Sequence, residues 1–299
     1  MILPDFILPS RQNQVWDESG LDSYAACLDK KHFKSYPHKV EYRYNSRGFR
    51  DTEWPETLEE LKECIWCFGD SFTVGLGSPI KHTWANILES NTNKKCINVS
   101  MDGASNNWIA RKAVRVLNEI APKYIVIHWS FITRYEDEDE SLCDELRRCH
   151  ASTETHARLI GQFNKLINQI ESVKNKSNII HSFIPNYLLD TENVDLIINR
   201  IWQSLRGNDW PLSPPLDRLQ LMNLDPAILS ELSQVNVIDY LIKLYDEPGS
   251  INLLTNTFNK ILYIPELTKQ DLARDGFHYD IITATNFVEQ LVDLISLPH

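Results

Sequence analysis

From about residue 64 onward, short apolar runs alternate with segments of helical periodicity, and this alternation constrains the fold more than any other feature of the chain. Runs that are apolar almost throughout are typical of parallel strands covered on both faces. Four such runs, and a plausible fifth at the end, occupy residues 64–68, 96–99, 124–129, 178–184 and 261–264. The pattern predicts an α/β domain with a mostly parallel, five-stranded sheet.

The segments between these runs have apolar residues at helical spacing. Helices are expected around residues 84–88, 108–120, 153–174 and 281–294. Residues 187–258 are too long for a bare connection between two strands, so we expect a helical insertion there. Residues 1–60 are rich in turn formers, with short strands expected near residues 40–44. We interpret residues 1–60 as an N-terminal extension packed on a main domain of residues 61–299.

Composition and charge narrow the classes of partner. The chain has 299 residues, of which 42% are hydrophobic, which is enough for a sizeable core. Its formal net charge of −11 and the lack of a long basic run argue against nucleic acid, because phosphate binding needs clustered Lys and Arg. No apolar run approaches eighteen residues, and no signal peptide is visible, so we expect no membrane span and a cytoplasmic protein.

No cofactor or metal site is expected. Cys64 and Cys67 form a lone C-x-x-C inside a predicted strand, where positions three apart point to opposite faces, so both are expected to pack in the core. Cys143 and Cys149 lack a recognised ligand spacing, and the acidic run at residues 136–140 is typical of a solvated segment. The glycines near residue 70 do not form the G-x-G-x-x-G of dinucleotide-binding enzymes.

Three polar segments follow predicted strands, where ligands bind in α/β sheets. Ser71 lies at a strand-to-helix turn, which exposes its hydroxyl beside helix N–H groups that can stabilise an oxyanion. Gly103 follows the second strand and can offer an unshielded N–H to the same oxygen. His278 follows the fifth strand, with Asp275 three residues earlier, which fits a general base and its orienting carboxylate.

These segments resemble the sequence blocks of the GDSL/SGNH hydrolase superfamily. Residues 68–75 (Phe-Gly-Asp-Ser-Phe-Thr-Val-Gly) look like the first block, residues 98–105 like the second and residues 275–278 (Asp-Gly-Phe-His) like the last. Residues 45–50 (Asn-Ser-Arg-Gly-Phe-Arg) look like a lead-in found in some bacterial and phage members, so such an origin is compatible with the sequence. The insertion lies outside the resemblance.

The resemblance implies a nucleophile at Ser71, a base at His278 and an orienting carboxylate at Asp275. It places the N–H groups of Ser71 and Gly103 in the oxyanion hole. The implied fold is a flavodoxin-like, three-layer α/β/α sandwich without a cofactor. The implied reactions are hydrolysis, and sometimes transfer, of acyl groups from esters, thioesters and acetylated sugars.

One block departs from the family pattern. After the third strand the family usually has G-x-N-D, whose Asn side chain completes the oxyanion hole, but by position Ile132 or Thr133 stands there in this chain. Losing one oxyanion donor costs on the order of 10²–10³ in rate unless another group substitutes. The candidates to substitute are Asn106, Ser130, Thr133 and Arg134.

The role of several other residues is open between structure and substrate binding. Trp66, Trp84, Trp108 and Trp129 lie in predicted core elements, although Trp129, at a strand end, can instead line the acyl pocket. Arg134 can contact substrate or form a buried ion pair with Glu136. His82 has no matching partner in the sequence and is interpreted as a surface residue.

Three functions remain open at the level of sequence. The first is a serine esterase that forms an acyl-enzyme at Ser71 with a small-molecule or glycan ester. The second is a catalytically weakened module that binds a glycan or partner through the same cleft. The third is an O-acyltransferase that passes the acyl group to an acceptor other than water.

Overall fold

The structure, a computed structural model, describes residues 3–27, 31–130, 134–136, 142–144, 153–184, 261–264, 267 and 269–296. Its centre is a five-stranded sheet in the order β4-β3-β5-β8-β9, in which every neighbouring pair is parallel. The strands are β3 (Ile65–Gly69), β4 (Cys96–Ser100), β5 (Tyr124–Trp129), β8 (Asn178–Phe183) and β9 (Leu262–Tyr263). The predicted α/β class and the five predicted strands are therefore confirmed. The expected insertion at 187–258 lies outside the described residues.

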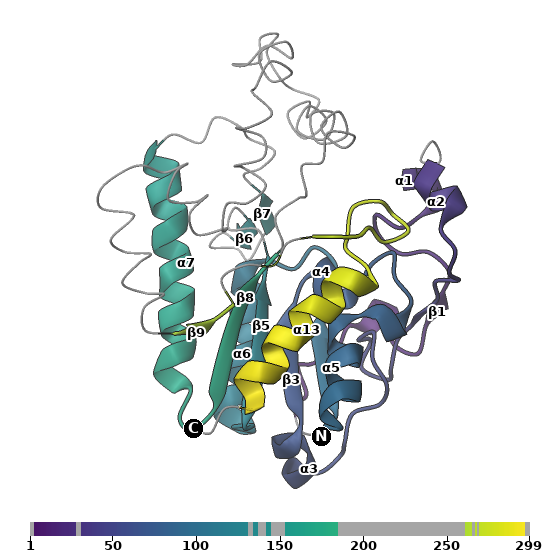
Figure 1. Cartoon of the computed structure of the whole chain (residues 1–299). Helices are drawn as coiled ribbons and strands as arrows, with labels where there is room; N and C mark the ends of the chain where they lie inside the picture. Colours follow the sequence, from purple (N-terminus) through teal and green to yellow (C-terminus); the bar gives the residue numbers. More distant parts are fainter. Residues whose placement is uncertain are drawn as a thin grey trace.

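Helices cover both faces of this sheet and make it the middle layer of three (Figure 1). On one face α6 (Asn106–Glu119) lies beside α7 (Thr153–Val173), and on the other α5 (Trp84–Thr92) lies beside α13 (Ile281–Ser296). These helices start and end within a few residues of the predicted ones, except that α5 extends four residues beyond the predicted segment. The observed layers agree with the α/β/α sandwich that the resemblance implied.

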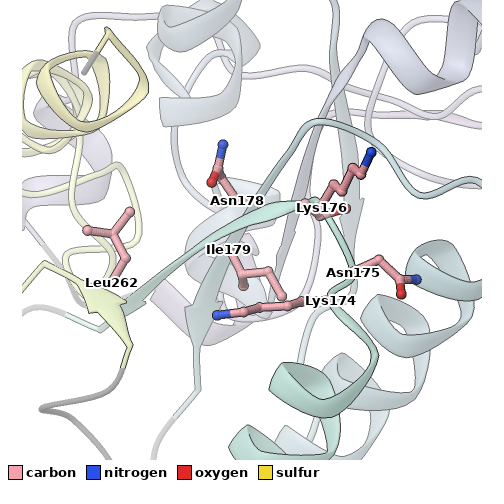
Figure 2. A pocket seen from close by; sticks show the side chains of 7 residues that line it. Lys174, Asn175, Lys176, Asn178, Ile179 and Leu262 are labelled. Carbon is pink, nitrogen blue, oxygen red and sulfur yellow. The ribbon is translucent and has the colours of Figure 1, made fainter. Parts of the chain in front are cut away.

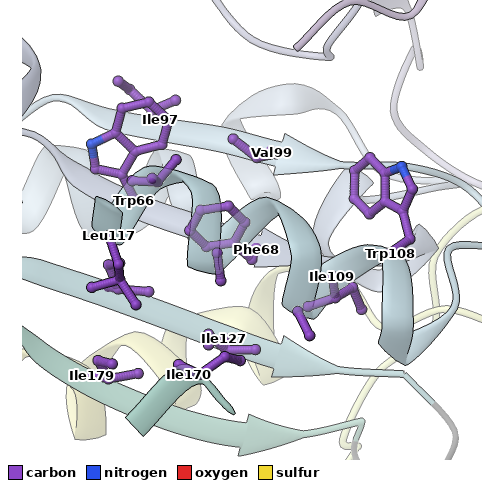
Figure 3. Packing of buried hydrophobic residues seen from close by; sticks show 14 of the residues in the cluster. Trp66, Phe68, Ile97, Val99, Trp108, Ile109, Leu117, Ile127, Ile170 and Ile179 are labelled. Carbon is purple, nitrogen blue, oxygen red and sulfur yellow. The ribbon is translucent and has the colours of Figure 1, made fainter. Parts of the chain in front are cut away.

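Two apolar clusters explain why the strands are apolar throughout. Successive side chains of a strand point to opposite faces, so Trp66 and Phe68 join the α6–α7 side while Ile65 and Cys67 join the α5–α13 side. The first cluster interleaves residues of β3, β4 and β5 with Trp108, Ile109 and Leu117 of α6 (Figure 3). Cys64 and Cys67 are both buried and free, one in each cluster, as expected.

The remaining described elements are short. In the N-terminal part, β1 and β2 form an antiparallel pair, as β6 and β7 do after β5. These elements are η1 (Pro9–Arg11), β1 (Val15–Trp16), α1 (Tyr24–Cys27), α2 (Lys31–Ser35), β2 (Tyr42–Arg43), α3 (Leu58–Glu63), α4 (Ser71–Val74), η2 (Ile80–His82), β6 (Arg134–Glu136) and β7 (Leu142–Asp144). Among the described residues, no helix has both the length and the apolar character needed to cross a bilayer.

Candidate active site

The first side chain of the site stands on a sharp turn between β3 and α4. Gly69 ends the strand, and a Cβ added there would lie 2.0 Å from Thr73 Oγ1, so the turn accepts only glycine at this position. Asp70 caps the helix, because its Oδ1 accepts the N–H of Phe72 at 3.0 Å. Ser71 is the first residue of α4, which places its hydroxyl at the carboxyl edge of the sheet.

A buried arginine of the N-terminal part, Arg50, stabilises this turn by hydrogen bonds to its backbone. The guanidinium of Arg50 donates to the carbonyl oxygens of Val74, Gly75 and Ser78, at 3.1, 2.5 and 2.7 Å. These carbonyls lie at the carboxyl end of α4 and in the loop that follows it. Arg50 therefore satisfies acceptors that have no partner within a four-residue helix. Arg50 belongs to the lead-in segment 45–50. The structural role of that segment is therefore to hold the turn that carries Ser71.

The second part of the site is the turn at residues 273–278, just before α13. The N–H of Ala273 donates to the carbonyl of His278 at 2.8 Å and closes the turn, and Gly276 has a φ of 63° inside it. Asp275 Oδ1 accepts the N–H groups of Phe277 and His278 at 2.9 and 3.1 Å. The carboxylate of Asp275 is therefore fixed in direction by its own backbone.

These two turns meet and form a continuous chain of hydrogen bonds. His278 Nε2 lies 2.8 Å from Ser71 Oγ, and His278 Nδ1 lies 2.6 Å from Asp275 Oδ2. The three residues are 207 and 3 positions apart in sequence and between 0 and 5% exposed. Burial alone would raise the pKa of Asp275, but the charge and hydrogen bond of His278 and two backbone N–H groups outweigh it and lower that pKa to about 2.

Two backbone N–H groups lie at the same edge of the sheet and face no acceptor among the described residues. Gly69 and Ser100 are register partners in β3 and β4, so Ser71 and Gly103 follow neighbouring strands at the same end. Within the described part of the chain, neither the Ser71 N–H nor the Gly103 N–H donates a hydrogen bond. Gly103 has a φ of 75°, and a Cβ added there would meet no atom within 4 Å, so this glycine borders open space.

The segment after β5 reaches the site through Asp70. Ser130 Oγ donates to Asp70 Oδ2 at 2.6 Å, and the guanidinium of Arg134 lies 3.3 Å from the same oxygen. The buried side chain of Asn106 accepts the N–H of Ser130 at 3.0 Å, which holds Asn106 against the end of β5. Ile132 and Thr133 lie outside the described residues. Asp70, which the sequence did not mark for any role, is thus the link between the first and third segments.

One sequence-based interpretation is wrong, and two alternatives that the sequence left open are narrowed. His82 is buried rather than on the surface, because its Nδ1 bonds Asp280 at 2.9 Å, a contact 198 residues away that no local pattern reveals. Arg134 pairs with Asp70, while Glu136 pairs with Arg111 instead. Trp129 is fully buried, lies with its ring parallel to that of His181 and donates its Nε1–H to His181 Nδ1 at 3.0 Å, so it belongs to the core and not to a pocket wall.

The other tryptophans of the predicted core elements, Trp66, Trp84 and Trp108, are buried as expected. No cluster of three or more metal-binding side chains occurs among the residues that the structure describes. A pocket of about 300 Å³ lies at the amino end of β8, lined by residues 174–179 and Leu262 (Figure 2). Since the strands are parallel, this pocket is at the opposite edge of the sheet from Ser71.

No family model matches the chain, and no curated protein matches it in sequence. Three solved structures illustrate the matches in fold. A family two carbohydrate esterase from Clostridium thermocellum, in complex with cellohexaose, is 14% identical, with a TM-score of 0.42 over 81% of this chain and 65% of that one. A protein described as lipolytic and of the G-D-S-L family, from Desulfitobacterium hafniense, is 14% identical, with a TM-score of 0.41 over 78% and 99%.

The third is the periplasmic domain of a lipopolysaccharide acetyltransferase from Salmonella ser. Paratyphi A, which is 14% identical, with a TM-score of 0.40 over 78% of this chain and 84% of that one. The hydrogen bonds and burial of the site's own residues carry its assignment.

Proposed function

We propose that this chain is a serine hydrolase of the GDSL/SGNH type, which cleaves carboxylic esters through an acyl-enzyme at Ser71. The observation that supports it is the unbroken line of hydrogen bonds from Ser71 through His278 to Asp275. A hydroxyl within 2.8 Å of an imidazole, which in turn is held by a buried carboxylate, is the arrangement that activates a serine nucleophile.

In the first half of the reaction, Ser71 Oγ attacks the acyl carbonyl carbon as His278 Nε2 takes its proton. The carbonyl oxygen becomes an oxyanion, and the new imidazolium is stabilised by Asp275, which keeps its negative charge because its pKa is low. When the tetrahedral intermediate collapses, the C–O bond to the leaving alcohol breaks, and His278 returns the proton to that alcohol. The acyl group remains on Ser71.

In the second half, water enters where the alcohol left, gives its proton to His278 and attacks the acyl carbon. Collapse releases the carboxylic acid and restores the Ser71 hydroxyl with the proton held by His278. An acceptor alcohol in place of water would give acyl transfer by the same steps, and acceptor-dependent product formation would separate transfer from hydrolysis. The substrate class is an acyl ester or an O-acetylated glycan.

The proposed oxyanion hole contains the N–H groups of Ser71 and Gly103, with Asn106 as the third donor. Asn106 replaces the asparagine that the family carries after the third strand. Its Oδ1 accepts the Ser130 N–H at 3.0 Å, which holds the side chain at the end of β5. A donor fixed in advance stabilises the developing charge without reorganisation.

The substitution Asn106→Asp tests this role, because it keeps the acceptor for the Ser130 N–H and removes the amide donor. We expect kcat for an activated ester to fall by on the order of 10²–10³, with KM little changed. Thr133→Val serves as the comparison variant and should retain kcat. A loss in Thr133→Val with none in Asn106→Asp would assign the third donor to Thr133 instead.

Covalent labelling tests the nucleophile directly. A fluorophosphonate probe should add one phosphonyl group to the wild-type chain, and peptide mass spectrometry should locate it on Ser71. His278→Ala should slow labelling strongly, because the hydroxyl loses its base. Labelling that persists in Ser71→Ala would contradict the assignment.

A module that binds a glycan or partner without turnover is the second candidate. The departure of the third block from G-x-N-D and the 5% exposure of Ser71 favour it. Turnover of p-nitrophenyl acetate by the wild type that disappears in both Ser71→Ala and His278→Ala would exclude this candidate.

A further inference from the structure

The turn that carries Asp275 and His278 is held on both sides by residues of the first 60. Arg274 precedes Asp275 and is bound by Asp22, while Asp280 follows His278 by two positions and is bound by Tyr36. Each contact joins positions more than 240 residues apart in sequence. Residues 274 and 280 therefore act as the two flanks of the turn.

On the first flank, Asp22 and Arg274 form a bidentate ion pair. Arg274 Nε donates to Asp22 Oδ1 at 2.9 Å, and Arg274 Nη2 donates to Asp22 Oδ2 at 2.7 Å. Asp22 is fully buried, and the Tyr42 hydroxyl also donates to it. Burial would lower the pKa of Arg274, but the hydrogen bonds and charge of Asp22 raise it, so the guanidinium stays charged. Paired planar contacts of this kind fix direction as well as distance.

On the second flank, Asp280 is held by two side chains. The Tyr36 hydroxyl donates to Asp280 Oδ2, and His82 Nδ1 lies 2.9 Å from Asp280 Oδ1. Burial and the neighbouring carboxylate raise the pKa of Tyr36 far above its ordinary value, so its hydroxyl stays protonated and able to donate. The side chain of Asp280 is thereby fixed between the N-terminal part and η2.

Between the flanks there is little room for the turn to shift. Gly77 packs beneath it, and a Cβ added there would lie 3.0 Å from the backbone nitrogens of both Arg274 and Asp275. The loop of residues 17–22, which contains Asp22, also lies against the residue before Gly103, a proposed oxyanion donor. A Cβ added at Gly20 in this loop would lie 2.1 Å from Asp102 Oδ2. The loop of residues 17–22 therefore touches both halves of the site.

We propose that Asp22 and Tyr36 are positioning residues, which hold the Asp275–His278 turn in register with Ser71 through Arg274 and Asp280. This inference rests on the proposed serine-hydrolase function. Reacting groups displaced by about 1 Å lose on the order of 10²-fold in rate, whereas substrate binding need not change. The N-terminal part is thus a component of the active site in addition to its packing role.

Four substitutions test the inference in the full chain. Asp22→Asn removes the ion pair, and Tyr36→Phe removes a single hydroxyl from a half-buried ring. Arg274→Lys keeps a charge that can still pair with Asp22 and serves as the conservative variant. Glu53→Gln is the matched control, since Glu53 is an exposed acid of the same N-terminal part that bonds the N–H and hydroxyl of Ser46 at 2.8 and 2.6 Å.

The readouts are kcat and KM for p-nitrophenyl acetate, the rate of fluorophosphonate labelling at Ser71, and Tm. We expect Asp22→Asn and Tyr36→Phe each to lower kcat and the labelling rate by about 10- to 100-fold at temperatures well below Tm, with KM within about twofold. Arg274→Lys should lose less of the wild-type kcat than Asp22→Asn does, and Glu53→Gln should match the wild type.

The outcomes separate the two proposals. A wild type that is neither labelled nor active would contradict the proposed function itself. A wild type labelled at Ser71, together with Tyr36→Phe and Asp22→Asn variants that react at the wild-type rate, would overturn the positioning role alone. If Asp22→Asn does not fold, Tyr36→Phe decides, because loss of one hydroxyl leaves the ion pair and the ring packing in place.

Discussion

Ser71→Ala and His278→Ala are each expected to lower kcat of ester hydrolysis by on the order of 10⁶-fold, and the double variant is expected to be no worse than either single one. Both residues act in the same proton transfer, from the Ser71 hydroxyl to His278. Once one of them is missing, the other has no partner for this transfer. The residual rate would come from the oxyanion donors and from substrate binding, which neither substitution removes.

Steady-state kcat with an activated ester measures this loss, after active-site titration to exclude traces of wild-type enzyme. Ser90→Ala is a matched control, because Ser90 is an exposed serine of α5 whose hydroxyl donates to the Asn86 carbonyl of the same helix at 3.0 Å. Losses in the single variants that multiply in the double variant would show that Ser71 and His278 act independently, contrary to the shared step.

The sheet was predictable because its signal is local. Each strand is a run of apolar residues whose alternate side chains enter one of two cores, so β5 could be bounded to the residue and β4 to within one. Ser71 and Gly103 follow β3 and β4, which are neighbours in the sheet, so topology alone brings them to the same edge. His278 follows β9, which lies three strands away from β3, so its contact with Ser71 depends on the turn at residues 273–278 before α13.

What the sequence did not reveal depends on contacts between distant segments. Asp22, Tyr36 and His82 carry no periodicity or motif, and each gains its partner only when residues 274–280 come within reach. The sequence left Arg134 open between substrate binding and an ion pair with Glu136, and it did not point to Asp70. The fully buried carboxylate of Asp70 pairs with Arg134, because a charge without water needs a counter-charge.

Asp275→Asn is expected to have the second largest effect, a loss of on the order of 10⁴ in kcat with KM little changed. An amide at position 275 can present an N–H to His278 Nδ1, where the carboxylate presents an acceptor. Nδ1 then accepts, the ring proton moves to Nε2, and Nε2 can no longer take the proton of Ser71. Labelling by a fluorophosphonate should slow by a similar factor, and an unchanged labelling rate would contradict the role of Asp275.

The same variant should change how stability depends on pH. The pKa of Asp275 falls from its ordinary 3.8 to about 2 on folding, so the unfolded chain binds the proton more tightly. Its ionisation therefore contributes about 2 kcal/mol that is fully present above pH 4 and is lost as the pH falls through 2.

The asparagine variant lacks this titration. Urea unfolding at pH 5, 4, 3 and 2 should show the difference in free energy of unfolding between wild type and Asp275→Asn shrinking by about 2 kcal/mol as the pH falls. A difference that stays constant over this range would mean that Asp275 is not held as a low-pKa carboxylate. The imidazolium formed during catalysis would then lack the fixed negative charge that the proposed mechanism requires.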